Sequence, residues 1–143
     1  SRGATRLVPY EGTIDSPRYQ EMIANVLPDI RKMYPKNDWY LVQDSAKPHT
    51  SKVSQAYLAR NVPSFLPPSE WPANSPDISA VENVFGDQQE RVNEKDPQTL
   101  REMKRIVESE WKKLTPEKCK TFVSKVPKRL RKIVETGGEY VLD

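Results

Sequence analysis

Two acidic residues occupy places in the sequence where they could do chemistry. Asp44 follows the short apolar run at 39–42, and Glu82 lies about two turns into the helix predicted after the turn-rich segment 67–76. In open α/β sheets, ligand sites gather beyond the carboxyl ends of strands. A buried carboxylate is costly unless it is paired, so acids at such a site should meet a cation. Mg²⁺ or Mn²⁺ is the natural candidate, because hard divalent ions prefer oxygen ligands.

The other reactive side chains leave little alternative chemistry. The chain has a single His, His49, and a single Cys, Cys119, which excludes a Cys/His zinc site and an internal disulfide. Cys119 shares helical spacing with Phe122, so we expect it in the core. We expect His49 either to hold the loop after Asp44, by orienting it or by a hydrogen bond to the backbone, or to contact a phosphate group. On spacing alone, Asp44 could equally be an ordinary cap or loop residue.

The composition is that of a polar chain that can still fold. With 143 residues, the chain has the length of one domain. Apolar residues make up 36% and charged residues 30%, and 13 prolines accompany 5 glycines, which excludes collagen-like and disulfide-rich scaffolds. No apolar run reaches the roughly 18 residues of a membrane span, and no apolar segment follows a basic start. We expect neither a membrane partner nor a secretory signal.

The first half of the sequence alternates between strand and helix patterns. The run 4–12 predicts a strand, and 15–35 predicts an amphipathic helix that begins with a capping residue and a proline. The run 39–42 predicts a strand buried on both faces. Helical spacing at 51–61 and a short apolar run at 62–66 complete the pattern. This order predicts an α/β fold.

The second half predicts helices. Ser75-Pro76-Asp77 has the cap, proline and acid of a helix start, which would put Glu82 about two turns into that helix. Further helices are expected from Asp96-Pro97, from Thr115-Pro116, and from about Pro127 to the glycines at 137–138.

Basic residues gather near the C-terminus. From residue 111 to 132 the sequence has nine Lys and Arg residues and one acid. A basic stretch near a carboxylate site indicates a nucleic-acid partner, although it is also typical of a solvated helix face. The residues that we expect to contact DNA are Lys47, His49, Lys128, Arg129 and Arg131.

Three blocks in order give the sequence a family likeness. They read QDSAKPHT (43–50), SKVSQAYLARN (51–61) and WPANSPDISAVENVF (71–85), and the tail reads SKVPKRLRKIVETGGEYV (124–141). The chain thereby resembles the catalytic domain of mariner-type DDE transposases. That family's pattern is Gln-Asp-Asn-x-x-x-His-Thr, a helix, a strand, and Trp-Pro-x-x-Ser-Pro-Asp-Leu-x-Pro-x-Glu. The resemblance covers essentially the whole chain.

The resemblance implies a ribonuclease-H-like fold, a mixed sheet with flanking helices. We expect one partial domain over 1–143, without the first strands of the sheet and with a helical C-terminal part at 91–143. Asp44 would be the second and Glu82 the third metal-binding carboxylate of the catalytic triad. The first Asp has no counterpart here, because Asp15 and Asp29 fall on the predicted helix. This chain alone is therefore expected to be inactive.

The sequence also departs from the family pattern. Ser45 replaces the usual Asn after the second Asp, and Ser79-Ala80 replaces the usual Asn-Pro before the Glu. Between Asp44 and Glu82 lie 37 residues, a few more than in many members, and the excess falls in the proline-rich loop. None of these changes removes a ligand.

The resemblance implies that the parent protein cleaves and joins DNA strands by two-metal phosphoryl transfer, with Mg²⁺ or Mn²⁺ as cofactor. Its partners would be transposon ends and target DNA, with a second copy or another segment supplying the missing strands. A nuclear location is expected from the resemblance and from the basic cluster 125–132. The alternatives are a domesticated, non-catalytic nuclear module that binds DNA or protein, and a nuclease with the same fold.

Overall fold

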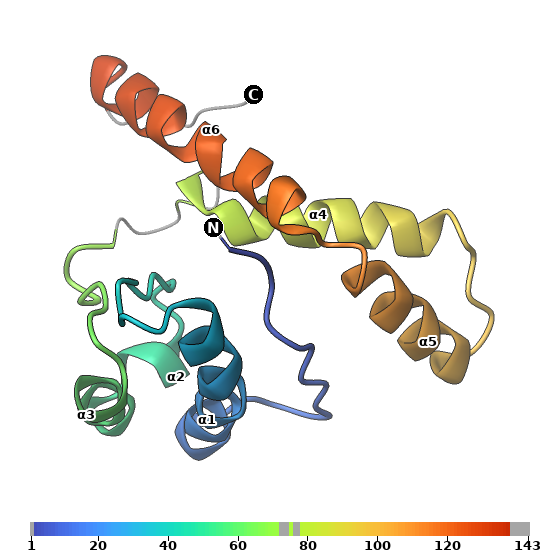
Figure 1. The fold of residues 1–143 in the computed structure, drawn as a ribbon, viewed down its shortest axis with the longest axis horizontal. Helices are drawn as coiled ribbons and strands as arrows, with labels where there is room; N and C mark the ends of the chain where they lie inside the picture. The colour runs from blue at the N-terminus through green and yellow to red at the C-terminus, as the bar shows by residue number, and fades with distance from the viewer. Residues whose placement is uncertain (1, 72–74, 76–77, 138–143) are drawn as a thin grey trace. The chain divides into compact units, whose positions relative to one another are not determined.

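The computed structural model describes residues 2–71, 75 and 78–137 (Figure 1). Helices dominate this part of the chain. In chain order they are α1 (Ser16–Met33), α2 (Lys47–Thr50), α3 (Lys52–Asn61), α4 (Ala80–Asn93), α5 (Leu100–Trp111) and α6 (Pro116–Glu135). The β structure within the described ranges is a single parallel bridge between Leu41 and Phe65.

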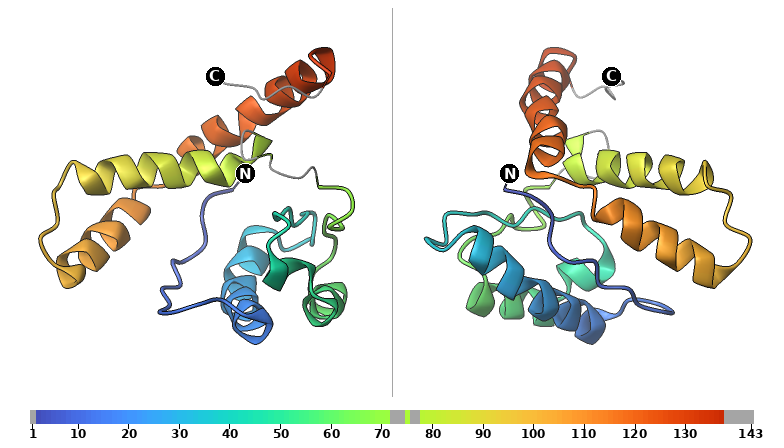
Figure 2. Two further views of the ribbon diagram at one scale, coloured as in Figure 1. Left: turned by 180° about the vertical axis from the view of Figure 1, so that it is seen from behind. Right: turned by 45° about the vertical axis from the view of Figure 1, so that its right-hand side comes forward.

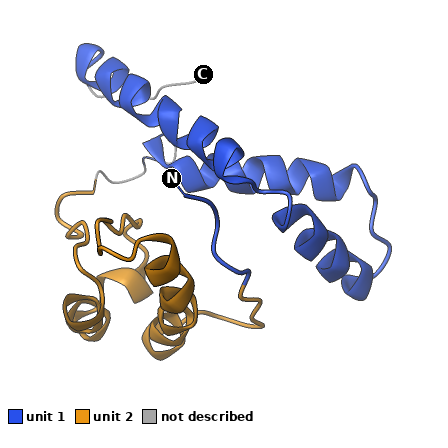
Figure 3. Cartoon of the chain, viewed as in Figure 1, with its two compact units in different colours: residues 1–7, 74–143 blue, residues 8–73 orange. Residues whose placement is uncertain are grey.

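The chain divides into two compact units (Figure 3). Unit 1 contains residues 1–7 and 74–143, and unit 2 contains residues 8–73. The boundary at 73–74 falls in the turn-rich segment that separates Asp44 from Glu82. Each unit has its own buried core.

In unit 2, α1 forms as its sequence pattern predicts. The Asp15 side chain caps the helix by accepting the Arg18 N–H at 2.9 Å, and Pro17 occupies the first turn, where its missing N–H costs nothing. Pro28 lies inside the helix. The helix buries Tyr19 and Leu27 and leaves most of its other residues at least partly exposed.

The core of unit 2 lies between α1, α3 and the extended segments. Its buried centre is Leu27, Leu58 and Val62, and the partly buried residues around it are Ile23, Trp39, Leu41, Tyr57 and Phe65. The predicted helix at 51–61 is confirmed as α3, and the Ser51 side chain caps it by accepting the Ser54 N–H. This packing fixes the segment that leads to Asp44.

The predicted strand at 39–42 is only partly formed. The Leu41 N–H donates to the Ser64 carbonyl, and the Leu66 N–H donates to the Leu41 carbonyl, both at 2.9 Å. Leu41 packs on the core, but Tyr40 and Val42 are each 52% exposed. Side chains alternate along an extended chain, and no other described element of unit 2 covers the second face. The expected burial on both faces is therefore absent in this unit.

The predicted strand at 4–12 is not formed among the described residues. A strand needs a neighbour whose backbone groups complete the ladder, and no described residue forms a β-ladder with this segment. The Trp111 indole N–H instead donates to the Thr5 carbonyl at 2.8 Å, which joins the start of the chain to α5 within unit 1.

Unit 1 is helical, as the sequence predicts. α4 packs against both α5 and α6 (Figure 2), and the buried residues of the unit include Ile78, Val92, Ile106, Leu114 and Cys119. The expectation that Cys119 is a core residue is confirmed. Glu110 is buried as well, at 1% exposed, and accepts hydrogen bonds from Lys95 and Lys113.

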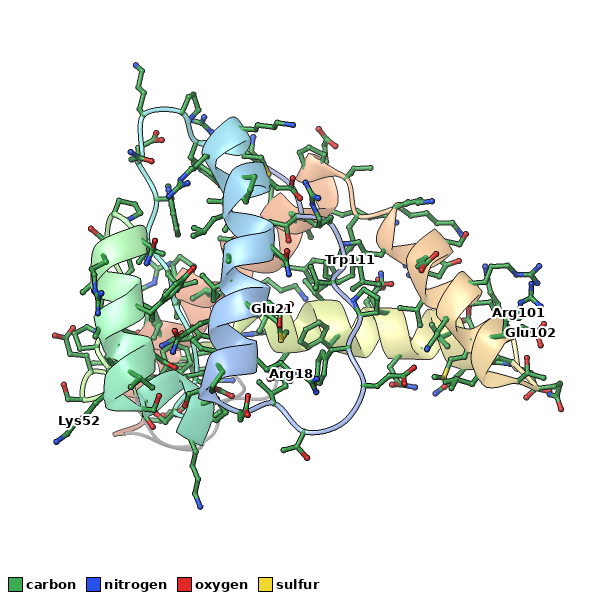
Figure 4. The ribbon with its side chains drawn as sticks, turned by 90° about the horizontal axis from the view of Figure 1, so that it is seen from below. Arg18, Glu21, Lys52, Arg101, Glu102 and Trp111 are labelled. Carbon is green, nitrogen blue, oxygen red and sulfur yellow. The ribbon has the colours of Figure 1, made fainter. Side chains whose placement is uncertain are left out.

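Two helices of unit 1 begin later than predicted. α4 starts at Ala80 with Ser79 as its N-cap; of the expected start, residues 76–77 lie outside the described residues. α5 starts at Leu100, and the Thr99 side chain caps it by accepting the Glu102 N–H at 3.1 Å. Glu102 lies near the start of α5 (Figure 4), and its carboxylate accepts the N–H of Gln98, the residue before the cap, at 3.1 Å. These two bonds resemble a capping box and place the helix start after residues 96–97.

The two C-terminal helices expected from the sequence are one helix. α6 runs through Pro127 without ending. Proline removes one backbone donor from a helix, yet its φ angle is helical, so packing can carry the helix through it. The predicted start is confirmed, with the Thr115 side chain capping Lys118, and Gly137 follows the helix with φ +70°. Residue 138 lies outside the described residues.

None of the helices in the described part of the chain combines the length and apolar character that a membrane crossing requires.

Candidate active site

Asp44 lies between the extended segment of unit 2 and α2. One of its carboxylate oxygens, Oδ1, accepts the Ala46 backbone N–H at 3.1 Å and faces His49 Nδ1 at 2.6 Å. The side chain nevertheless remains 62% exposed. Asp44 is thus an exposed acid whose orientation is set by contacts from the next five residues.

His49 is held in place from two directions. Its ring packs against the Tyr19 ring of α1, with centroids 4.5 Å apart and planes tilted by 45°. Its backbone carbonyl accepts the Gln55 side-chain amide at 2.6 Å. Of the two expected roles, orienting the loop after Asp44 agrees with this geometry.

Tyr19 links the helix α1 to the residue before Asp44. Its hydroxyl donates to the Gln43 side-chain carbonyl. Burial raises the pKa of Tyr19 to about 12, and the negative charge of Asp44 acts in the same direction. Tyr19 therefore stays protonated at neutral pH and remains a donor to Gln43.

Glu82 lies in the first turn of α4, and the prediction that it sits two turns into a helix is wrong because the helix starts at Ala80. Its side chain is exposed, and no described residue forms a hydrogen bond or ion pair with it. An acid in the first turn of a helix also interacts favourably with the helix dipole. The next residue, Asn83, donates to the Ser79 carbonyl at 3.1 Å and accepts from Arg129 at 3.0 Å.

Asp44 belongs to unit 2 and Glu82 to unit 1, so their sharing of one metal site stays a prediction. No group of three or more His, Cys, Asp or Glu residues in the described ranges could hold a metal ion. Each acid by itself nonetheless fits a divalent cation. Asp44 Oδ2 and the Glu82 carboxylate have no hydrogen-bond partner among the described residues, and exposed anionic oxygens are the donors that Mg²⁺ and Mn²⁺ take.

The predicted DNA contacts differ in accessibility. Lys47 in α2 and Lys128 and Arg131 in α6 are exposed. Arg129 is buried at 5% exposed and bonded to Asn83, so the expectation of an exposed phosphate contact is wrong at this residue. A buried guanidinium must stay paired inside the fold; Arg129 joins α6 to α4.

Sequence reasoning missed the roles of Tyr19 and Gln43. Helical spacing places Tyr19 on the apolar face of the predicted helix 15–35 and indicates no further role, and Gln43 stands in the block 43–50 without an assigned function. The sequence offers one signal for Gln43, which is its position next to Asp44. It offers none for Tyr19, because no spacing rule connects a helix residue to a loop residue 24 positions later. The contact depends on how α1 packs.

Two curated relatives are similar to this chain in sequence. The Tc3 transposase of Caenorhabditis elegans is 28% identical over 127 residues, which cover 87% of this chain and 38% of that protein. The Tcb1 transposase of Caenorhabditis briggsae is 22% identical over 127 residues, which cover 89% of this chain and 45% of that protein. The chain thus spans less than half the length of these relatives. No protein-family model matches it.

Solved structures of the Mos1 mariner transposase share the fold. Its catalytic domain with raltegravir and Mg has a TM-score of 0.80 at 20% identity, and the match covers 92% of this chain and 67% of that one. The Mos1 pre-cleavage transpososome also gives 0.80 at 20% identity, over 92% of this chain and 39% of that one. Sequence motifs, sequence similarity and fold agree: the chain is similar in sequence to these two transposases and shares its fold with the Mos1 mariner transposase catalytic domain.

Proposed function

We propose that the full protein containing this catalytic-core segment cuts and joins DNA strands by metal-assisted phosphoryl transfer. The observation that carries the proposal is the similarity to the Tc3 transposase, which runs over 87% of the chain. By the motif resemblance, Asp44 and Glu82 are the second and third acids of the catalytic triad. The first Asp would come from residues outside this chain.

Asp44 and Glu82 would hold Mg²⁺ or Mn²⁺ together with that first Asp. Both present carboxylate oxygens to solvent, which is what a hard cation requires. A cation held by these carboxylates would supply activation of a water or a 3′-hydroxyl and stabilisation of the leaving oxygen. Mos1 catalytic-domain structures with Mg and with Mn support this choice of cofactor. The role of this chain is to supply ligand oxygens and keep them accessible.

We infer that DNA is the partner. Exposed Lys128 and Arg131 on α6 and exposed Lys47 beside Asp44 can neutralise phosphates without reading bases. Solved Mos1 assemblies include a paired-end complex with the left transposon end. On this analogy the full protein would bind transposon ends as a dimer.

We further propose that strands from outside this chain complete the ribonuclease-H-like sheet beside residues 39–42. Tyr40 and Val42 are half exposed, and no described residue forms a backbone hydrogen bond with either of them. An edge with free backbone groups is a site for strand addition. The first strands of the parent domain, or a segment of a second copy, would fill this edge.

Nuclear location remains part of the proposal. It rests on the family resemblance and on the basic cluster 125–132, which lies on α6 and is exposed at Lys125, Lys128, Arg131 and Lys132. A fluorescent fusion of the chain, compared with a variant carrying Ala at these four positions, tests it. Nuclear accumulation that persists in the variant would contradict a signal in this cluster.

The catalytic proposal is tested with the protein extended by its upstream residues. The substrate is a supercoiled plasmid carrying the DNA that flanks its gene, and nicking is followed on gels with Mg²⁺ or Mn²⁺. We expect Asp44→Asn and Glu82→Gln each to reduce nicking by 100-fold or more, on the order of the loss of a catalytic group.

Glu90→Gln is the matched control, because Glu90 is an exposed acid two turns further along α4. It should nick at the wild-type rate. Equal activity of Glu82→Gln and Glu90→Gln would contradict the triad assignment. If no upstream Asp exists on a predicted strand and the wild type does not nick, the domesticated DNA-binding alternative replaces the enzyme.

A further inference from the structure

The two oxygens of the Asp44 carboxylate are in different situations. Oδ1 accepts the Ala46 N–H and contacts His49 Nδ1. Oδ2 has no hydrogen-bond partner among the residues that the structure describes. The Asp44 side chain is 62% exposed, so Oδ2 is open to solvent. A carboxylate held through one oxygen cannot rotate freely, so the other oxygen keeps a fixed direction.

The contact between His49 and Asp44 assigns the role of one ring nitrogen, Nδ1. An ionised carboxylate only accepts hydrogen bonds, so Nδ1 of His49 carries the proton and donates. The donor must therefore sit at the Nδ1 position of the side chain. A side chain whose donor lies further out, at the Nε2 position, would not donate to Oδ1 of Asp44 with the same geometry.

Tyr19 supports the His49 ring from the side. It is buried at 5% exposed, its ring contacts the imidazole, and its hydroxyl is bonded to Gln43. The start of its helix is tied to the cap of α3 by a 2.8 Å hydrogen bond between the Ser16 and Ser51 hydroxyls. The support for Asp44 thus extends from the loop into the packed part of unit 2.

We propose that His49, supported by Tyr19, is a positioning residue that occupies Oδ1 of Asp44 and leaves Oδ2 as the oxygen that binds a divalent cation. The inference rests on the proposed function, since it assumes that Asp44 is a metal ligand. It adds the residues that orient the ligand. Outer residues of this kind commonly change metal affinity by about 10- to 100-fold when replaced.

The test is a Mn²⁺ titration of the ¹⁵N-labelled chain, followed by paramagnetic broadening of the Ser45 and Ala46 amide signals. It measures binding and needs no catalytic activity. His49→Asn places an amide donor near the Nδ1 position, and His49→Gln places one further out. Both lose the aromatic contact with Tyr19, so they form a matched pair. Circular dichroism and Tm confirm that each variant is folded.

We expect His49→Asn to keep the midpoint within about threefold of wild type, and His49→Gln to raise it about tenfold or more. Tyr19→Leu, which removes ring contact and hydroxyl, should raise the midpoint by a smaller factor than His49→Gln. Equal midpoints for wild type, His49→Asn and His49→Gln would overturn the inference. So would equal losses in the two His49 variants, since a purely structural role of the ring predicts that result.

Asp44→Asn separates the inference from the proposed function. If Asp44→Asn abolishes the broadening while the His49 variants bind as wild type does, Asp44 remains a ligand and only the positioning role fails. If Asp44→Asn broadens as wild type does, or wild type shows no broadening, the metal assignment of Asp44 fails and the inference with it.

Discussion

Asp44 in unit 2 and Glu110 in unit 1 are carboxylates that each bring two donors to a single oxygen. Lys95 and Lys113 reach Glu110 Oε1 at 2.5 and 2.7 Å, and the side chain is buried. The donors to Asp44 are a backbone N–H and an imidazole, and the side chain is exposed. Glu110 is neutralised by its own partners and is a structural residue. Asp44 is oriented without being neutralised by lysine or arginine, so its charge is available to a cation.

Asp44 and Glu82, the two acids of the candidate site, also differ in how they are held in place. Asp44 is oriented by a backbone N–H and by the His49 side chain, whereas Glu82 is placed by its position on α4 alone. What secures α4 near Glu82 is the bond from Arg129 to Asn83. The positions of the donors, and whether they carry charge, therefore tell more about a carboxylate than its sequence context does.

The largest effect is expected where a buried charge is removed from unit 1. Arg129→Ala deletes a buried stem and a charged hydrogen bond, and should lower the free energy of unfolding by about 2–4 kcal/mol. Urea unfolding measures it. Lys128→Ala, an exposed neighbour on α6, is the control and should change stability by less than about 0.5 kcal/mol. Similar values for both would mean that Arg129 does not join the helices.

A second test follows the melting temperature of a Glu110 variant across pH. Hydrogen bonds from Lys113 and then Lys95 lower the pKa of Glu110 from 4.5 to about 2. A lowered folded-state pKa stabilises the fold above the unfolded value and loses that contribution as pH falls through the folded one. Glu110→Gln should therefore lower Tm at neutral pH and flatten the decline of Tm between about pH 5 and pH 2. A profile of Tm against pH that is identical for Glu110→Gln and wild type would contradict the pairing of Glu110 with the two lysines.

A third test asks whether exposed basic residues of α6 contact DNA phosphates. Each phosphate contact contributes about 0.9 to the slope of log affinity against log salt. Replacing Lys128 and Arg131 together by Ala should reduce that slope by about 1.8, with similar weakening on unrelated sequences. Fluorescence anisotropy over a salt series measures it. An unchanged slope would assign these residues to an ordinary solvated face.

The smallest effects on stability are expected at the N-caps of α1 and α4. Asp15 caps α1 with a side-chain hydrogen bond, whereas the Ser79 side chain makes none at the start of α4. Asp15→Ala should cost about 1 kcal/mol, and Ser79→Ala only a few tenths. Thermal unfolding of both variants decides the point, and a larger loss for Ser79→Ala would show that the Glu82 helix depends on a cap after all.

Local patterns predicted much of this structure. The motif blocks indicated the resemblance to transposases, and capping residues located the starts of α1 and α6, because a cap is a short-range hydrogen bond encoded within a few residues. Helical spacing located α3. The burial of Cys119 followed from helical spacing. These features depend on neighbours in sequence.

What sequence reasoning missed depends on packing between distant segments. The burial of Arg129 requires Asn83 on another helix, and the support of His49 by Tyr19 requires α1 to lie beside the loop after Asp44. The start of α5 was misplaced because two capping signals compete, Asp96-Pro97 and Thr99 with Glu102. α6 passes through Pro127 although local rules favour a break there.

The half-exposed run 39–42 has a consequence for handling the chain on its own. An apolar strand edge with free backbone groups can pair with the same edge of another copy, which leads to aggregation. Charged residues that flank such a run oppose this pairing, and here Lys36 and Asp38 come before the run and Asp44 comes after it. Replacing Asp44 by a neutral residue therefore removes a charge that opposes aggregation as well as the proposed metal ligand.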